Sequence, residues 1–190
     1  MFVILQKEQL NNSVVRFVIH APAVAAKAEP GQFIILRTDS EGERIPLTVA
    51  GYDRKNGTVR IIFQVVGATT YKLNTLEVGD ELCDCVGPLG VPSKLEGLKK
   101  VLIVGGGVGC AIALPQAKWL KNHGAQVDLV AGFRNKDIVI LEDEMKAVCD
   151  NLYITTDDGS YGEQGFVTDV LKRLLDASEC DLVIAIGPIP

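Results

Sequence analysis

Histidine and clustered positive charge are scarce in this sequence. It has two histidines and a formal net charge of −5, and its lysines and arginines are scattered along the chain. Without a basic stripe, the protein has little to offer a nucleic-acid backbone, so we expect no nucleic-acid partner. His20 ends an expected strand and His123 lies beside a helix-ending glycine, and we interpret both as structural.

Long uninterrupted apolar runs are also missing. The longest apolar stretches, such as VLIVGGGVGCAIALP, are broken by glycine and are too short or too interrupted to span a bilayer. The first residues, MFVILQKEQL, lack the positive region that precedes the apolar part of a secretory signal. We therefore expect a cytoplasmic protein with no membrane span.

The five cysteines suggest neither a disulfide framework nor a metal site. An odd number of cysteines without a secretory signal argues against disulfides. Cys83 and Cys85 stand one residue apart in an alternating stretch, so we expect both thiols to face the same side. A metal site there would need two more ligands nearby, and the sequence offers none.

Two halves with different periodicity follow one another in the chain. Residues 1–97 contain short alternating stretches, separated by the turn signals PG, KNG and VGD, and no helical period interrupts them. This pattern predicts a small antiparallel β-barrel. The expected strands are FVIL, VVRFVIH, GQFIILRT, PLTVAGYD, TVRIIFQVV and DELCDCVG.

Residues 98–190 alternate strand and helix patterns instead. KKVLIVGGG is a continuous apolar run typical of a strand buried on both faces, and a helical pattern follows it. The alternation repeats with AQVDLVAGF and ILEDEMKAVC, then with NLYITTDDG and GFVTDVLKRLLDAS, before a last strand DLVIAIGP. We predict a doubly wound α/β domain with a parallel sheet, in which the last strand is an edge unless the natural chain continues.

A glycine-rich loop, VGGGVG (residues 104–109), stands between the first of these strands and its helix. Glycines in this setting allow a backbone to approach a pyrophosphate at a helix start, although a tight turn is an alternative. The predicted contacts are Gly105, Gly106, Gly107, Val108 and Gly109. Asp128 has the spacing of a ribose-binding carboxylate, but it lies inside its strand, which disfavours that role.

Ligands of open α/β sheets gather at the carboxyl ends of the strands. In this half those ends carry the glycine loop, GFRNKD, TTDDGSYGEQG and GPIP. Arg134, Asp157 and Asp158 are therefore candidate nucleotide contacts. A solvated arginine, and aspartates that cap the following helix, are the alternatives.

The first half has its own polar motifs. In ERIPLT, Arg44 stands before Pro46 and Leu47, with Thr48 two residues beyond the proline. Arg44 either holds an anion with help from the Thr48 hydroxyl or is a solvated arginine on an edge strand.

A second polar motif, VVGATT, offers Gly67, Thr69 and Thr70 to a phosphate or ribose. The alternative is that these residues cap a short helix around residues 71–76. GPLG, residues 87–90, reads as a turn.

Taken in order, R-x-P-L-T, G-x-T-T, G-P-L-G and G-G-G-x-G resemble the ferredoxin–NADP reductase family of flavoproteins, over nearly the whole chain. The resemblance implies that Arg44 pairs with the FAD pyrophosphate, which its two parallel donors suit. It also implies that residues 46–48 line the isoalloxazine, with Thr48 near N5, and that NAD(H) or NADP(H) binds the second domain.

One branch of that family is especially similar: the small electron-transfer subunits of NADH-dependent ferredoxin:NADP oxidoreductase, of sulfide dehydrogenase and of dihydroorotate dehydrogenase B. This implies hydride transfer between nicotinamide and FAD, with electrons passing to an iron–sulfur centre, a larger flavoprotein subunit or ferredoxin. The branch carries a cysteine-rich segment for a [2Fe–2S] cluster, whose ligands this chain lacks, so we expect a truncated chain or a variant. A non-catalytic nucleotide-binding module that senses redox state is the alternative from another class.

Overall fold

Two compact units make up the chain in the computed structural model, which describes residues 2–187. They comprise Met1–Ser93 and Lys94–Pro190, a division close to the expected change at residue 97. The first unit holds a seven-stranded antiparallel sheet and the second a five-stranded parallel sheet, so the predicted fold class is confirmed. Among the described helices, none combines the length and apolarity needed to cross a bilayer.

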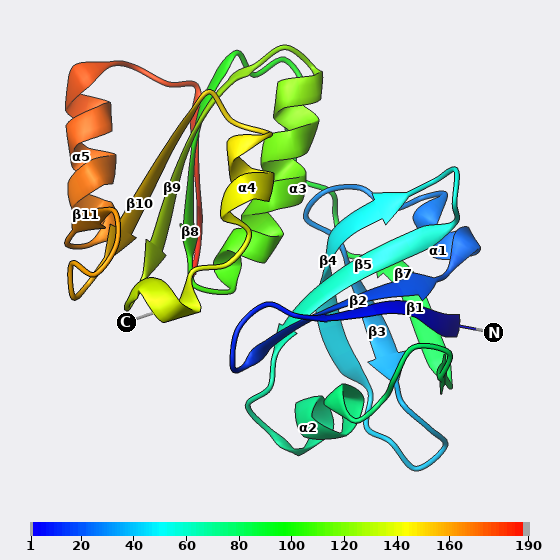
Figure 1. The fold of residues 1–190 in the computed structure, drawn as a ribbon. Coiled ribbons are helices and arrows are strands. Elements are labelled where there is room, and N and C mark those ends of the chain that lie inside the picture. Colours follow the sequence, from blue (N-terminus) through cyan, green and yellow to red (C-terminus); the bar gives the residue numbers. More distant parts are fainter. Residues whose placement is uncertain (1, 188–190) are drawn as a thin grey trace. The chain divides into compact units, whose positions relative to one another are not determined.

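The sheet of the first unit almost closes on itself (Figure 1). Its strands run in the order β6-β1-β2-β5-β4-β3-β7. The two end strands follow one another in the chain with only Cys83 between them, so the ends of the sheet are brought together. The strands are β1 (Phe2–Gln9), β2 (Val14–His20), β3 (Phe33–Arg37), β4 (Ile45–Asp53), β5 (Thr58–Gln64), β6 (Glu81–Leu82) and β7 (Asp84–Leu89).

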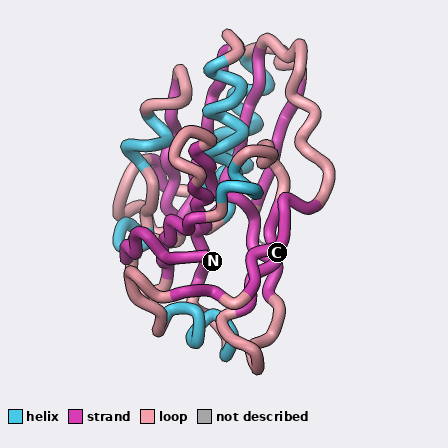
Figure 2. Tube along the Cα trace, turned by 90° about the vertical axis from the view of Figure 1, so that its right-hand side faces the viewer, coloured by secondary structure: helices cyan, strands magenta, loops and turns pink. Residues whose placement is uncertain are grey.

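Two short helices interrupt the strands of this unit, which the alternating pattern did not predict (Figure 2). They are α1 (Pro22–Ala25) and α2 (Ala68–Asn74). Elements of four and seven residues are too short to establish a helical period, so the sequence pattern shows none there. The alternative interpretation of VVGATT as the start of a short helix is confirmed, although α2 begins earlier than residue 71.

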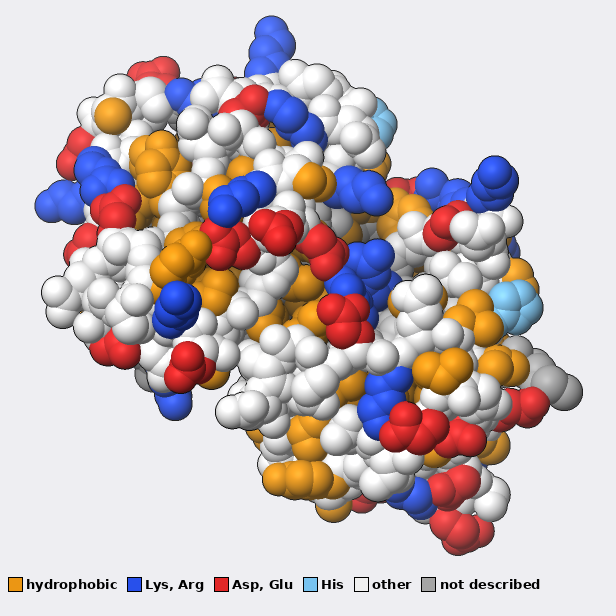
Figure 3. Space-filling model, viewed as in Figure 1, with side chains coloured by type: hydrophobic (Ala, Val, Ile, Leu, Met, Phe, Trp, Pro, Cys, Tyr) orange, Lys and Arg blue, Asp and Glu red, His pale blue; other side chains and the backbone are white. Residues whose placement is uncertain are grey.

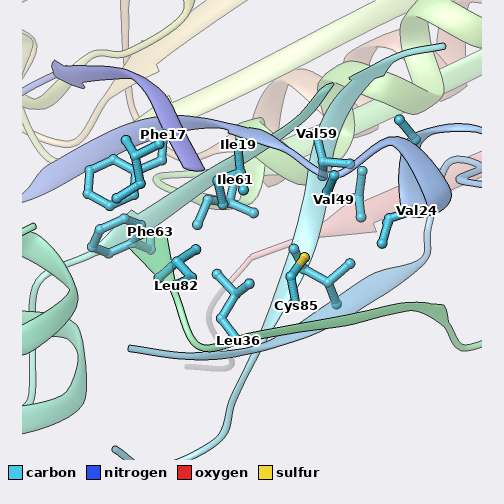
Figure 4. Packing of buried hydrophobic residues seen from close by; sticks show 14 of the residues in the cluster. Phe17, Ile19, Val24, Leu36, Val49, Val59, Ile61, Phe63, Leu82 and Cys85 are labelled. Atoms are coloured by element: carbon cyan, nitrogen blue, oxygen red, sulfur yellow. The ribbon is translucent and has the colours of Figure 1, made fainter. Parts of the chain in front are cut away.

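Inward-facing side chains of the barrel strands form one apolar core (Figure 4). Phe17 and Phe63 meet edge to face with ring centroids 5.3 Å apart. Leu36 of β3 is fully buried in the same cluster, and Cys85 of β7 is nearly so. Because alternate residues of a strand point to opposite faces, a filled interior leaves their neighbours on the outside.

The second unit is built around a parallel sheet with helices on both faces (Figure 1). Helices α3 and α4 lie on one face and α5 on the other. The strands are β8 (Lys100–Gly106), β9 (Gln126–Phe133), β10 (Asn151–Thr156), β11 (Glu163–Gln164) and β12 (Leu182–Ile186). The helices are α3 (Gly109–Asn122), α4 (Glu142–Lys146) and α5 (Val167–Ala177), with a 3₁₀ turn, η1 (Lys136–Ile138).

Strand order places the switch point of this sheet at β8. The order is β11-β10-β9-β8-β12, so the chain moves outward from β8 through β9 and β10 and then returns to its other side. Ligands of open α/β sheets bind at such a switch point, outside the carboxyl ends of the strands. The glycine loop lies at the carboxyl end of β8.

Some expected elements of this unit differ from the observed ones. The helix expected over ILEDEMKAVC is only the five residues of α4, and the two-residue strand β11 was not expected. Among the described strands β12 stands at the edge, which is one of the two alternatives that the sequence left open. Its apolar side chains are only partly covered, whereas those of β8 are mostly buried. Residues 188–190 of GPIP lie outside the described residues.

Candidate functional site

The outer face of β4, β3 and β7 carries the ERIPLT motif of the first unit. Pro46 pairs with Ile35, and Ile35 pairs with Val86, so these three side chains form one row across the strands. Leu36 and Cys85, in the adjacent row, are buried. The Pro46 row therefore points away from the barrel core and presents an apolar surface.

A row of charged residues borders this apolar row. Arg37 and Asp84 are direct partners in the register, and Arg44 precedes β4 at the same level. Asp84 Oδ2 lies 2.7 Å from Arg37 Nε and 3.2 Å from Arg44 Nη2. The Arg44 side chain is 60% exposed, whereas that of Arg37 is 21% exposed. The row has two cations and one anion and therefore an excess of positive charge.

The first half of β4 has an open edge. β4 pairs with β3 over residues 45–48, but its pairing with β5 begins only at Val49. Pro46 lacks an N–H and is tolerated there because no strand lies on that side. The edge-strand interpretation is therefore right for this half of β4, although β4 as a whole lies inside the sheet.

Thr48 and Leu47 point in opposite directions from this open part of β4. Leu47 packs against the barrel core, whereas Thr48 is half-buried and pairs with Phe33 on the outer side. Within the described residues the Thr48 hydroxyl has no hydrogen-bond partner, so it is available to a ligand.

The loop before α2 lies next to the Arg44 segment. Thr69 Oγ1 donates a 2.7 Å hydrogen bond to Glu43, the residue before Arg44. Thr70 Oγ1 accepts hydrogen bonds from the N–H groups of Val66 and Gly67, each at 3.0 Å. The structure thus brings Arg44 and Thr69 into one region, while the hydroxyl of Thr70 fixes the turn itself.

This face fits a ligand that has an anionic phosphate part and a flat apolar ring. The charged row provides exposed guanidinium donors, which match phosphate oxygens. The neighbouring Pro46 row provides apolar surface, and the Thr48 hydroxyl lies one row further along β4. FAD combines these features, so the residues present fit the cofactor that the sequence suggested.

The glycine loop of the second unit is tightly packed. A Cβ atom at Gly109 would lie 2.4 Å from the carbonyl oxygen of Ile186, and one at Gly105 would lie 2.8 Å from Cys110 Sγ. Gly107 has a φ of +54°, which favours glycine. Its N–H donates to the carbonyl of Gly132 at 2.8 Å, so the loop is fixed to the end of β9.

Helix α3 begins directly after this loop. The N–H groups of Cys110 and Ala111 bond back to Gly107 and Val108. The N–H groups of Val108 and Gly109 precede these bonds at the start of a 14-residue helix. Such a helix start attracts the negative charge of a phosphate.

Arg134, Asp157 and Asp158 meet at the carboxyl ends of β9 and β10. The N–H of Asp157 donates to Phe133 O at 3.1 Å, and that of Asp158 donates to Arg134 O at 3.3 Å. The Asp158 carboxylate accepts two hydrogen bonds from Ser160. These bonds are the main reason why the pKa of Asp158 is lowered. The Asp157 carboxylate is exposed and makes no side-chain contact within the described residues.

The capping interpretation of these two aspartates is wrong. Helix α5 begins only at Val167, and the N–H of its N-cap residue, Phe166, bonds to Asp169 Oδ2 at 3.2 Å. Asp157 and Asp158 instead belong to a turn that leads into β11. The turn requires left-handed backbone at Gly159, with a φ of +72°.

The segment after β10 is fixed at both ends. Thr156, fully buried, donates a hydrogen bond to Tyr161 O and accepts one from Tyr161 N. The Tyr161 hydroxyl donates to Glu142 of α4 at 2.9 Å. This contact raises the pKa of Tyr161, and the pKa of Glu142 is lowered, first by Lys146. Sequence reasoning missed these anchors because they join separate elements.

Asp128 does not reach the carboxyl edge. It is the third residue of β9, about 16 Å along the strand from Phe133 at 3.3 Å per residue. Its carboxylate accepts a 2.7 Å hydrogen bond from Asn151. The ribose role, which the sequence disfavoured, is therefore excluded by position.

The expectation that Cys83 and Cys85 face the same side is wrong. Cys83 is exposed and Cys85 buried, because the strand is interrupted at Cys83, where the chain passes from β6 to β7. Arg37 Nη2 donates a 3.3 Å hydrogen bond to Cys83 Sγ. Within residues 2–187, no group of three or more potential ligands is arranged to hold a metal.

Neither histidine lies among the site residues. His20 is exposed at the end of β2. His123 ends α3 and stacks on Trp119, with ring centroids 3.6 Å apart. Both positions are consistent with structural roles.

No family model matches the chain, but individual relatives do. It is 45% identical over 185 residues to the dihydroorotate dehydrogenase B electron transfer subunit homolog of Thermotoga maritima, covering 97% of this chain and 65% of that protein. It is 36% identical over 189 residues to the dihydroorotate dehydrogenase B (NAD(+)) electron transfer subunit of Streptococcus pneumoniae, covering 97% and 72%.

A solved structure of NADH-dependent reduced ferredoxin–NADP oxidoreductase, described in terms of flavin-based electron bifurcation, is similar as well. A chain of that structure has a TM-score of 0.92 and 44% identity, covering 99% of this chain and 68% of its own. The chain belongs to the ferredoxin–NADP reductase-like family of small electron-transfer subunits. It spans about two thirds of the length of these members of the family.

Proposed function

We propose that this chain is the flavin- and nicotinamide-binding part of an electron-transfer subunit. It would act as a FAD-dependent NAD(P)H oxidoreductase and pass electrons to an iron–sulfur centre or a partner flavoprotein. The observation that carries the proposal is the outer face of β4, β3 and β7, where an exposed guanidinium borders an apolar row and an available hydroxyl. Family membership supports the same function.

In this proposal FAD lies along the first half of β4. Arg44 pairs with the pyrophosphate. The Thr69 hydroxyl, which donates to Glu43 in the structure, would give up that hydrogen bond to donate to the phosphate. Gly67 and Thr70 shape the turn that holds Thr69 in place. Pro46 and Thr48 contact the isoalloxazine, and Leu47 anchors the strand to the core.

The nicotinamide nucleotide would bind the carboxyl edge of the second sheet. The loop of residues 105–109 receives the pyrophosphate, because its glycines keep the backbone accessible. Asp157 directly follows β10, and its N–H bonds to Phe133 at the end of β9. Its carboxylate would accept a hydrogen bond from a ribose hydroxyl. Arg134 and Asp158 would border the adenosine.

FAD, when bound, supplies the hydride and single-electron chemistry, so the chain needs no acid–base pair of its own. Its residues hold the two ligands and adjust their environment. The Thr48 hydroxyl would donate a hydrogen bond to the flavin near N5, which favours the more electron-rich reduced form. The apolar row beside it would keep water from the flavin ring.

NADH is the donor that we propose. A carboxylate such as Asp157 accepts hydrogen bonds from a free ribose 2′-hydroxyl and repels a 2′-phosphate. The names of the pneumococcal relative and of the solved oxidoreductase refer to NAD(+) and NADH, which supports this choice. Arg134 is the opposing feature, since an exposed guanidinium at the same edge would attract a 2′-phosphate.

An absorption spectrum of the purified protein tests the proposal. We expect a flavin band that bleaches under anaerobic conditions on addition of NADH and less on addition of NADPH. A flavin band that neither nucleotide bleaches would contradict the role of the second unit. A colourless protein that cannot be reconstituted with FAD would overturn the flavin assignment and favour the non-catalytic nucleotide-binding module.

Two partners are possible within this function. The solved structure favours a larger flavoprotein subunit of the ferredoxin:NADP oxidoreductase type, with ferredoxin as a redox partner. The names of the Thermotoga and pneumococcal relatives favour a dihydroorotate-oxidising subunit. Copurification of the subunit from cells that express both candidates would distinguish them. A [2Fe–2S] cluster would have to be held outside this chain.

A further inference from the structure

We propose that Asp84 is a positioning residue for Arg44. This inference rests on the proposed function, because it concerns how the guanidinium is presented to the FAD pyrophosphate. Asp84 lies at the start of β7, 40 residues from Arg44 in sequence. Neither the motif that contains Arg44 nor the GPLG motif includes it.

The geometry ties Asp84 to Arg44 through one carboxylate oxygen. Asp84 Oδ2 accepts a hydrogen bond from Arg44 Nη2 at 3.2 Å. A guanidinium has five N–H donors in a planar arrangement, so a contact at one nitrogen leaves others for a phosphate. Asp84 can therefore stay in place while Arg44 binds an anion.

Arg37 holds the Asp84 carboxylate in place. Its Nε lies 2.7 Å from the same Oδ2, and its Nη1 and Nη2 contact Ser40 O and Cys83 Sγ. The Arg37 side chain is largely buried and is held from three sides, so it fixes the carboxylate. The positive charge of Arg37 also offsets the negative charge of Asp84, so the carboxylate repels a neighbouring phosphate less.

Without Asp84, Arg44 would lose its fixed orientation. Arg44 lies in the loop that precedes β4, and its side chain is 60% exposed. An arginine without a partner can adopt many rotamers, and binding a ligand would restrict it to one of them. Binding of FAD would then have to order that side chain. We therefore expect removal of Asp84 to weaken FAD binding although it removes a negative charge.

The opposite expectation follows if Asp84 merely competes with the phosphate for Arg44. In that case Asp84→Ala and Asp84→Asn would both tighten FAD binding. The sign of the change therefore separates positioning from competition. In a positioning role, Asp84→Asn would fall between the wild type and Asp84→Ala, because the amide oxygen can still accept from Arg44.

A double-mutant cycle tests the proposal on the whole chain. The dissociation constant of FAD would be measured by flavin fluorescence on flavin-free protein for the wild type, Arg44→Ala, Asp84→Ala and the double variant. We expect Asp84→Ala to weaken binding about tenfold in the wild type and less than about twofold in the Arg44→Ala background. Equal losses in both backgrounds would mean a general structural role and overturn the inference.

Two controls complete the experiment. Glu8→Ala removes another cross-strand carboxylate–arginine pair of the same barrel, with Arg16, and should leave FAD binding unchanged. If Asp84→Ala does not fold, Asp84→Asn provides the same comparison, and unchanged or tighter binding by it would overturn the inference. If Arg44→Ala binds FAD as tightly as the wild type does, the proposed role of Arg44 is contradicted.

Discussion

The Thr69 hydroxyl donates a 2.7 Å hydrogen bond to the carboxylate of Glu43. This contact joins the start of α2 to the residue before Arg44, across 26 residues of sequence. Lys72 of α2 and Asp39 form a second link, an ion pair at 2.6 Å between the same two segments. The chain segments that carry the two motifs are thus held close to each other. Charges of both signs are interspersed on the face shown in Figure 3.

Replacing Thr48 with valine should slow flavin reduction while FAD stays bound. Valine keeps the shape of the side chain but removes the hydroxyl, so the flavin would lose one hydrogen bond. We expect reduction by NADH to slow about tenfold in anaerobic stopped-flow experiments. Thr48→Ser keeps the hydroxyl and serves as the control. Reduction by Thr48→Val at the wild-type rate would exclude the role of Thr48.

Asp157→Asn should reduce the preference for NADH over NADPH. The amide carries no charge, so it no longer repels a 2′-phosphate, and it accepts more weakly from a ribose hydroxyl. We expect the ratio of kcat/KM values for the two nucleotides to fall about tenfold. Asp176→Asn is the control, since that exposed carboxylate stands near the end of α5 and away from the proposed nucleotide site. The assignment fails if the control shifts the ratio as much as Asp157→Asn does.

Gly109→Ala should destabilise the second unit. The added Cβ would lie 2.4 Å from the Ile186 carbonyl oxygen, and backbone cannot move aside as a flexible side chain can. We expect a loss of about 1–3 kcal/mol in the free energy of unfolding. Trp119, the single tryptophan, lies in α3, so its fluorescence reports on this unit.

Gly67→Ala is the control for that experiment. Nothing lies within 4 Å of a Cβ at Gly67, and its φ of −153° is ordinary extended backbone. The control should change the stability by less than about 1 kcal/mol. Equal stability of Gly109→Ala and the wild type would contradict the close packing of the glycine loop.

The contribution of Glu142 to stability should depend on pH. Its folded-state pKa is lowered, first by the hydrogen bond from Lys146, so the ionised form favours folding. That stability is present above the ordinary pKa of 4.5 and is lost as the pH falls through the folded-state value. The wild type should therefore have a higher Tm than Glu142→Gln at pH 7, with the difference shrinking below pH 4.5. Asp143→Asn is the control, and a difference that does not vary with pH would contradict the prediction.

Cysteine labelling should separate Cys83 from Cys110. Cys83 is exposed, whereas Cys110 is fully buried under the glycine loop and burial raises its pKa to about 12. The thiolate is the reactive form, so Cys110 should resist iodoacetamide at pH 8 until the second unit unfolds. Peptide mass spectrometry would measure both sites, and rapid labelling of Cys110 in folded protein would contradict its burial.

The periodicity of apolar residues predicted the two sheets, because in each sheet the apolar positions of the strands are the buried ones. Strands of the barrel alternate buried and outward residues, and β8 has no charged residue after Lys100 because both of its faces are covered. The same reasoning missed α1 and β11, which are too short to establish a period, and it gave α2 only as an alternative. It overextended α4, whose first turn follows Leu141, a residue with a left-handed φ of 61°.

The candidate site was predictable where one short motif contains both the functional residue and the strand or helix start that positions it. The glycine loop and the ERIPLT strand are of this kind. Asp84 was not predictable, because its contact with Arg44 depends on the register of β3 against both β4 and β7. The environments of Asp157 and Asp158 likewise depend on the neighbouring strand β9 and on a glycine-determined turn, neither of which a local pattern describes.

The edge position of β12 has a consequence for amide exchange with solvent. β12 bonds to β8 along one side only among the described strands, and its side chains are partly exposed, while β8 and β9 occupy the centre of the sheet. Local opening starts where few contacts must break. Deuterium should therefore enter the amides of β12 well before those of β8 and β9, and the parallel sheet should open from that side inward.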